Sequence, residues 1–254
     1  MIKKDLSNRV HLIDEVRGFS ILCMVVYHAA YDLVALFGVS IPLFFSPVMQ
    51  NFLQPLFAGL FIFISGTAAN YSHSNLKRGA ICFLLGMVLT IGTWIVMPSQ
   101  LIAFGILHCL GVCMMLSPLF LSLAKKIRPI VLIPVSLVLF FLLYSLPQGQ
   151  IGLFSFTFAI PHACYDTPFL FWLGLPNNTF FSSDYFPLIP WIFAFLAGVS
   201  FGRIVKENRC PAFFYKMHCR PLALIGRHTL VIYLLHQPVV YGIFSLLAFL
   251  FPRG

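Results

Sequence analysis

The chain has 254 residues, of which 60% are hydrophobic and only 9% are charged. Such a composition excludes an ordinary water-soluble domain, which carries far more charge, and indicates an integral membrane protein. The formal net charge of +9 is concentrated between the apolar runs. We therefore interpret it as a membrane-orientation signal and expect no nucleic-acid partner.

Seven apolar runs of roughly 20 residues could each cross a hydrocarbon core of about 30 Å. Continuous runs of this length are typical of helices, not of the alternating strands of a closed barrel. The sequence therefore predicts an all-α, polytopic membrane helix bundle, with one domain over residues 1–254. The predicted spans are 19–39, 52–71, 80–97, 102–124, 129–146, 186–204 and 222–250.

Seven crossings place every basic residue except Arg253 on one side of the membrane. By the positive-inside rule that side is cytoplasmic, so the N-terminus is predicted inside and the C-terminus outside. The polar start and the absence of a small-residue cleavage site argue against a removed signal peptide. Short loops favour a bacterial inner membrane. The inner basic residues are Lys3, Lys4, Arg9, Arg17, Lys77, Arg78, Lys125, Lys126, Arg128, Arg203, Lys206, Arg209, Lys216, Arg220 and Arg227.

The first span carries two ionisable groups at depth, His28 and Asp32. His28 lies ten residues past Gly18, or roughly 15 Å along a helix, which is near the midplane. Asp32 follows four residues later, so it lies on the same face. A carboxylate one turn away can orient an imidazole and raise its basicity, so we predict His28 and Asp32 as a catalytic pair.

Three further groups enter the predicted outer half of the membrane, which is why we assign His108, Asp184 and His236 to the acceptor side. Each also has a simpler explanation. The histidines could make only helix–helix hydrogen bonds, and Asp184 could cap the following helix.

Arg17, Arg227, Lys77 and Arg78 are cations at the inner ends of spans. Arginine suits phosphate geometry, so we predict that these residues bind an anionic cofactor. Ordinary anchoring to lipid headgroups is the alternative for Lys77 and Arg78. No Cys-x-x-Cys pair occurs among the seven cysteines, and no metal site is expected.

Two segments depart from simple crossings. Residues 147–183 are apolar and aromatic but are interrupted by prolines and polar residues, and we predict a re-entrant or interfacial outer segment. The run 222–250 would reach about 43 Å as a helix. Either it begins in the cytosol or Pro238 bends it.

Five groups of residues resemble the catalytic-domain family of heparan-alpha-glucosaminide N-acetyltransferase, within a wider superfamily of transmembrane acyltransferases. Together they extend from residue 9 to residue 238, so the resemblance covers nearly the whole chain. The groups are Arg9–Gly18 running into Met24–His28, Phe63–Gly66, Phe104–His108, Asp184–Trp191 and Gly226–Pro238.

The resemblance implies a membrane-bound acyltransferase that moves an acetyl group from cytoplasmic acetyl-CoA to a glycan-like or lipid-linked sugar acceptor outside. Related integral-membrane O-acyltransferases use an arginine followed eleven residues later by a histidine, which corresponds to Arg17 and His28 here. His28 would deprotonate the acceptor or be transiently acetylated. The partners expected are the bilayer, acetyl-CoA and the acceptor, and a homo-oligomer is compatible.

Two other functions fit the same residues. A proton-coupled transporter or exporter could use the His/Asp constellation as a relay, and would move an unmodified substrate without CoA. A b-type cytochrome could ligate haem between His28 and His236, and would show a Soret band.

Overall fold

The computed structural model describes residues 10–153 and 156–251. Within them, six helices are long and apolar enough to cross a membrane, and a bent pair of helices can supply a seventh span. This confirms the predicted all-α polytopic bundle of about seven spans. Of the predicted inner cations, Lys3, Lys4 and Arg9 lie outside the described residues, as does Arg253.

The main elements follow one another in the order that the apolar runs predicted. The helices are α1 His11–Ala35, α2 Gln54–Ala69, α3 Asn75–Val96, α4 Ile106–Met115, α5 Ser117–Lys126, α6 Pro129–Leu142, α7 Leu188–Lys206, α8 Arg220–Arg227 and α9 Thr229–Leu250. A π-helical turn at Met49–Leu53 leads into α2. Short 3-10 helices lie at Pro42–Phe45, Pro98–Gln100, Leu146–Gln148, His162–Tyr165, Phe171–Leu173 and Ala212–Tyr215, and the strands are β1 Gln150–Leu153 and β2 Phe156–Ala159.

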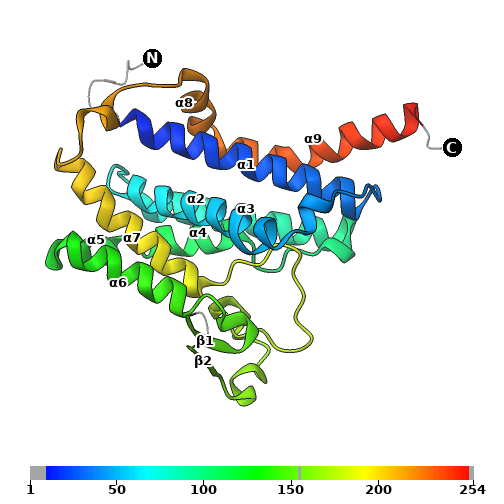
Figure 1. The fold of residues 1–254 in the computed structure, drawn as a ribbon, viewed down its shortest axis with the longest axis horizontal. Helices are drawn as coiled ribbons and strands as arrows, with labels where there is room; N and C mark the ends of the chain where they lie inside the picture. Colours follow the sequence, from blue (N-terminus) through cyan, green and yellow to red (C-terminus); the bar gives the residue numbers. More distant parts are fainter. Residues whose placement is uncertain (1–9, 154–155, 252–254) are drawn as a thin grey trace. The chain divides into compact units, whose positions relative to one another are not determined.

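The chain forms two compact units, one of residues 1–61 and 210–254 and the other of residues 62–209. In the first unit, α1 packs against both α8 and α9 (Figure 1). A β-carbon on Gly18 of α1 would collide with the backbone carbonyl of Leu222, and one on Gly226 of α8 would collide with that of Asp14. Small residues let helix backbones approach closely, which explains why α1 and α8 each need glycine here.

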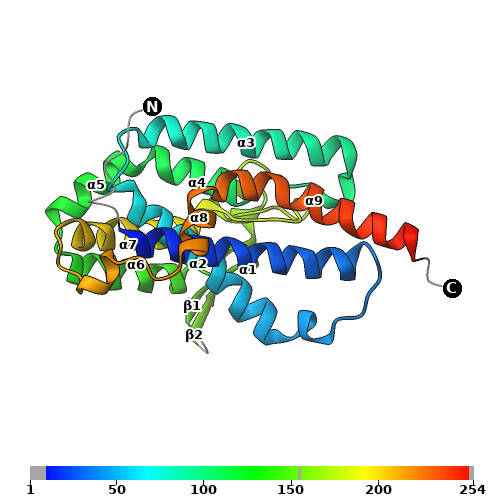
Figure 2. The ribbon, with the colours of Figure 1, turned by 90° about the horizontal axis from the view of Figure 1, so that it is seen from above.

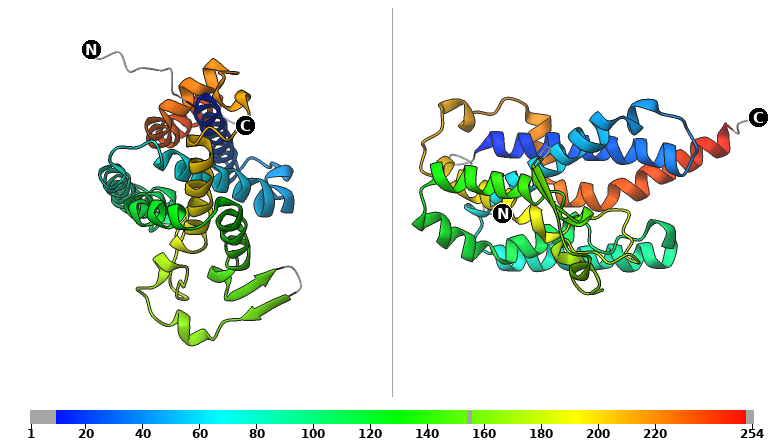
Figure 3. Two further views of the ribbon diagram at one scale, coloured as in Figure 1. Left: turned by 90° about the vertical axis from the view of Figure 1, so that its left-hand side faces the viewer. Right: turned by 60° about the horizontal axis from the view of Figure 1, so that its bottom comes forward.

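The second unit is built around α7, the most buried of its helices. Gly198 and Gly202, four residues apart on α7, leave room for the backbone of Phe63 and Thr67 of α2. The Thr67 hydroxyl donates to the Gly198 carbonyl at 3.1 Å. Figure 2 shows α3 running beside α4, and Figure 3 shows α6 beside α7. The small-xxx-small pattern on α7 is therefore a packing device.

Two predicted spans are interrupted. The fourth bends by 57° between α4 and α5, where Pro118 in the first turn of α5 cannot donate a backbone hydrogen bond. The last breaks at His228 into α8 and α9, and α9 continues through Pro238. The 22 residues of α9 alone are about 33 Å long, enough for one crossing.

The outer segment contains a β-hairpin that the sequence analysis did not foresee. Strands β1 and β2 pair antiparallel, with Gln150 opposite Ala159. Gly149 and Gly152 have positive φ angles of 81° and 146°, which glycine adopts readily and other residues do not. In the described part of 147–183 no helix is long enough to span, in agreement with the prediction.

Candidate functional site

Four polar side chains meet where α1 lies beside α9 in the first unit. The ring centroids of His28 and His236 are 5.1 Å apart. One turn further along α1, Asp32 accepts a hydrogen bond of 2.7 Å from the side-chain amide of Gln237. We call His28, Asp32, His236 and Gln237 the α1–α9 cluster. It brings together three of the predicted site residues, and adds Gln237, which the sequence analysis missed.

The hydrogen bonds of His236 define which of its nitrogens can accept a proton. Its Nδ1 lies 2.6 Å from the backbone carbonyl of Tyr233. A carbonyl only accepts, so Nδ1 carries the proton and the neutral ring keeps a lone pair on Nε2. Nε2 of His236 is therefore the basic atom of this side chain.

Three buried polar atoms of the α1–α9 cluster have no hydrogen-bond partner among the described residues. They are Nε2 of His236, Oδ2 of Asp32 and Oε1 of Gln237. Buried polar atoms normally find partners, and a group of three exceptions at one place is typical of a site that binds a ligand or transfers protons. The cluster therefore has free hydrogen-bonding capacity on both helices.

Asp32 was expected to orient His28, but its hydrogen bond goes to Gln237. The two residues share a face of α1, as predicted, but within the described residues no hydrogen bond joins them. Asp32 is fully buried, and it accepts its hydrogen bond from Gln237 of the neighbouring helix. The carboxylate thus fixes α9 beside α1, and His28 is positioned by its ring contact with His236.

Near the start of α1, Arg17 of this helix and Arg227 of α8 share one buried carboxylate. Asp14 lies 3.9 Å from the guanidinium of Arg17 and 3.6 Å from that of Arg227. Asp14 thus brings two guanidinium groups close together, and arginine is the side chain best suited to bind phosphate. The sequence analysis predicted both arginines and missed Asp14, whose role depends on a contact between residues 14 and 227.

Glu15 holds the chain that leads into α8. Its Oε1 accepts backbone hydrogen bonds of 2.7 Å from His218 and 3.0 Å from Cys219, immediately before the helix begins. A carboxylate at this position also favours the positive end of the helix dipole. Glu15 therefore fixes α8, and with it Arg227.

In the second unit, both ring nitrogens of His108 have a neighbour at hydrogen-bonding distance. Its Nδ1 accepts from the backbone N–H of Gly105 at 3.2 Å, and its Nε2 lies 3.4 Å from the hydroxyl of Thr90. Phe104 stacks on its ring, with centroids 5.3 Å apart. A β-carbon on Gly86 would touch the imidazole. His108 is only 1% exposed, and this arrangement matches the alternative of a helix–helix hydrogen bond.

Asp184 caps α4 and not the helix that follows it. Its Oδ2 accepts from the backbone N–H of Ile106 at 3.3 Å, at the first residue of α4. The flanking chain reinforces this connection, because the N–H of Phe186 donates to the carbonyl of Phe104 at 2.9 Å. Asp184 thus ties the segment before α7 to the start of α4.

The outer segment adds aromatic rings to this region. Phe171 lies 6.3 Å from Phe104 and 4.8 Å from Phe180, measured between ring centroids. The Tyr185 hydroxyl donates to the Phe171 carbonyl. Burial raises the pKa of Tyr185 well above its usual range, so the phenol stays protonated and remains a donor. The segment is thereby joined to the residues that stack on His108.

Lys77 and Arg78 lie in the first turn of α3, and both are exposed. Positive charge at this end of a helix opposes its dipole, so these side chains do not stabilise α3 itself. They belong to the second unit, whereas Arg17 and Arg227 belong to the first. Among residues 10–153 and 156–251, no group of three or more His, Cys, Asp or Glu side chains could hold a metal ion.

A family model described as "Heparan-alpha-glucosaminide N-acetyltransferase, catalytic" matches residues 9–238. The chain belongs to this family. Membership in the heparan-alpha-glucosaminide N-acetyltransferase catalytic family, together with the apolar helices, indicates a multi-pass membrane acetyltransferase. The matched residues include Asp14 and the whole α1–α9 cluster. Comparisons with curated proteins and with solved structures found no match.

Proposed function

We propose that the protein transfers an acetyl group from cytoplasmic acetyl-CoA to a hydroxyl or amine of a glycan-like acceptor on the outer side of the membrane. The observation that supports this most is found within the first unit. Two helical segments placed side by side each carry an arginine near the predicted cytoplasmic end and a histidine deeper in the membrane. The arginines share Asp14, and the histidine rings are in contact.

The distance between the two groups suits the donor. Eleven residues separate Arg17 from His28 on one unbroken helix, which is roughly 16 Å at the helical rise. An extended phosphopantetheine arm has a comparable length. Phosphate groups held by Arg17 and Arg227 would therefore leave the thioester close to His28, without the bulky anionic part entering the bilayer.

The chemistry assigned to the cluster is acyl transfer with a histidine as base. The acceptor oxygen or nitrogen forms a bond to the thioester carbonyl carbon, and imidazole takes its proton. The carbon–sulfur bond then breaks, and the proton returns to the departing thiolate to give CoA. In the alternative route, an imidazole nitrogen of His28 is acetylated first and the acceptor takes the acetyl group from it.

The remaining predicted residues have supporting roles in this proposal. Oδ2 of Asp32 and Oε1 of Gln237 would accept hydrogen bonds from acceptor hydroxyls, because both are hydrogen-bond acceptors without a described partner. His108, Asp184, Lys77 and Arg78 belong to the second unit, and their assignment to the acceptor and the donor stays a prediction from the sequence, as does a lid role for 147–183.

The test is an assay of purified protein with acetyl-labelled acetyl-CoA and a panel of envelope glycans and lipid-linked sugars. We expect label to appear on an acceptor, and His28→Ala to lower the rate by about 10²- to 10⁴-fold, the usual contribution of general acid–base catalysis. His73→Ala is the matched control, because His73 is exposed in the second unit and outside every assigned site.

The assay also distinguishes the two routes and the rival function. Label that remains on the protein in the absence of acceptor, and is lost in His28→Ala, indicates the acetyl-enzyme route. Full activity of His28→Ala would overturn the assignment of His28. Transport of an unmodified sugar without acetyl-CoA would overturn the acyltransferase proposal and favour the transporter.

A further inference from the structure

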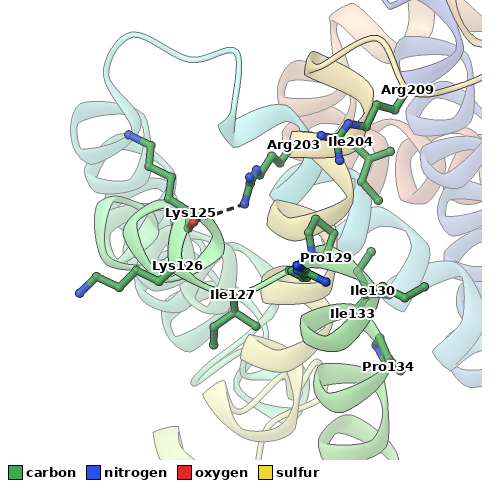
Figure 4. A pocket seen from close by; sticks show the side chains of 11 residues that line it. Lys125, Lys126, Ile127, Pro129, Ile130, Ile133, Pro134, Arg203, Ile204 and Arg209 are labelled. Atoms are coloured by element: carbon green, nitrogen blue, oxygen red, sulfur yellow. Dashed lines mark hydrogen bonds between the residues drawn. The ribbon is translucent and has the colours of Figure 1, made fainter.

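A hollow of about 600 Å³ lies in the second unit, where α5 ends, α6 begins and α7 ends (Figure 4). None of its lining residues belongs to the α1–α9 cluster or to the sites predicted for the donor and acceptor. The lining residues are Lys125, Lys126, Ile127, Arg128, Pro129, Ile130, Ile133, Pro134, Arg203, Ile204 and Arg209.

The lining is strongly positive. It includes two lysines and three arginines and no acidic residue. The nearest compensating charge is Glu207, which lies 2.8 Å from Arg203 and 3.2 Å from Arg209. One carboxylate cannot balance five cations, so the hollow attracts anions.

The three arginines differ in how many of their guanidinium donors already have an acceptor. Arg203 donates to the backbone carbonyl of Ala124 and also binds Glu207, so it holds the end of α7 against the end of α5. The guanidinium of Arg128 has no hydrogen bond or ion pair with the described residues, and Arg209 uses one edge of its guanidinium on Glu207. In Figure 4 the lysine side chains extend away from the hollow. Arg128 and Arg209 therefore have the free donors.

The first turn of α6 adds to this attraction. Arg128 is its N-cap residue and Pro129 its first residue, and the Arg128 carbonyl accepts from the backbone N–H groups of Val131 and Leu132. The positive end of the helix dipole lies at the same place. This contribution strengthens an anion site that the side chains already form.

The rest of the hollow is apolar and continues into exposed apolar surface. Ile127, Ile133 and Ile204 line it, and Ile130 is 79% exposed. The exposed apolar surface continues along α6 through Val131, Val135 and Val138. A soluble anion would gain nothing from this surface, whereas the acyl chains of a lipid would cover it.

We propose that the hollow between α5, α6 and α7 binds the phosphate of an anionic phospholipid, with its acyl chains lying along the exposed face of α6. Its basic residues belong to the side that the charge distribution predicts to be cytoplasmic. Basic pockets at that membrane surface are suited to anionic headgroups. This lipid site is independent of the proposed acetyl transfer.

The test measures dissociation constants of phosphatidylglycerol and phosphatidylcholine for the full-length protein in neutral detergent, by native mass spectrometry. We expect phosphatidylglycerol to bind at least about tenfold more tightly, a preference that salt weakens. Arg128→Gln with Arg209→Gln should remove this preference while leaving the interhelical contact of Arg203 in place. Ile133→Phe should weaken lipid binding by filling the hollow without changing its charge.

The control variant is Lys216→Gln with Arg220→Gln, which removes two exposed cations from the first unit and should preserve the preference. Three results would overturn the proposal. They are equal affinity for both lipids, an unchanged preference in the double arginine variant, and competition by inorganic phosphate or acetyl-CoA at the concentrations where the lipid binds. The last would identify a site for soluble anions.

Discussion

The two regions that carry membrane histidines use their hydrogen-bonding capacity very differently. In the second unit, both nitrogens of His108 have neighbours at hydrogen-bonding distance, and a phenylalanine and a glycine enclose the ring. In the first unit, His236 uses one nitrogen on its own backbone and leaves the other buried without a described partner.

This difference separates residues that hold helices together from residues that can act on a substrate. Burying an unsatisfied polar atom destabilises a protein by about 1–3 kcal/mol, so a group of such atoms persists where function requires it. Sequence position alone does not distinguish a packing histidine from a catalytic one, because His108 and His236 both lie in apolar helices. The hydrogen-bond partners around each ring do distinguish them, and mutagenesis can test this comparison.

The largest effect is expected for His236→Ala. Removing Nε2 should lower the acetyl-transfer rate by about 10²-fold or more, if this atom takes or relays the proton. The measurement is kcat with labelled acetyl-CoA, with the melting temperature as a control for folding. A variant that keeps its full rate would show that His236 is a packing residue like His108.

His108→Ala should lower stability and leave the rate nearly unchanged. Loss of a buried ring beside Gly86 and Phe104 should lower the free energy of unfolding by about 2–4 kcal/mol. The rate per folded molecule should change by less than about threefold. Thermal melting and kcat, measured on the same preparation, distinguish these effects. A large fall in kcat without a fall in melting temperature would contradict the structural assignment.

Gln237→Leu tests whether the cluster must be held together across α1 and α9. The substitution removes the donor to Asp32 and keeps a side chain of similar size. We expect a rate about tenfold lower, because Asp32 loses the hydrogen bond from Gln237 and the acceptor loses a hydrogen bond. Gln237→Glu, which places a second carboxylate beside Asp32, should be at least as damaging.

The smallest effect concerns the exposed end of α7 in the second unit. The hydrogen bond from Arg203 holds the pKa of Glu207 below its ordinary value of 4.5. When the pKa is lower in the folded state, the ionised carboxylate adds stability that is fully present above pH 4.5. This stability is lost as the pH falls through the folded-state pKa. Wild type should therefore melt slightly higher than Glu207→Gln at pH 7, and the difference should shrink below pH 4.5. A difference that does not change with pH would contradict this account.

The spans could be predicted because they depend on local composition. Long apolar runs and the distribution of basic residues give the helices in the right order, and helical spacing places His28 and Asp32 on one face. The break at His228 was not foreseen, because residues 222–250 were predicted as one span that begins in the cytosol or bends at Pro238. The hairpin at 150–159 was missed because short strands resemble any other short apolar segment.

The site was predictable only where the chemistry was evident in single residues. Histidines and arginines in apolar helices attract attention by themselves, and the resemblance to the family directed it to Arg17 and His28. Asp14, Glu15 and Gln237 act through partners about 200 residues away in the chain. No local pattern indicates such pairings, since they arise from the packing of α1 against α8 and α9.

The same pairings determine when the contacts of α1 can form during synthesis of the chain. The ribosome completes α1 long before it makes α8, so Asp14 and Glu15 enter the membrane surface with Arg227 and the backbone of residues 218–219 still unmade. The first unit therefore cannot complete its packing until residues 218–227 have been made, and a chain that stops before α8 lacks these contacts.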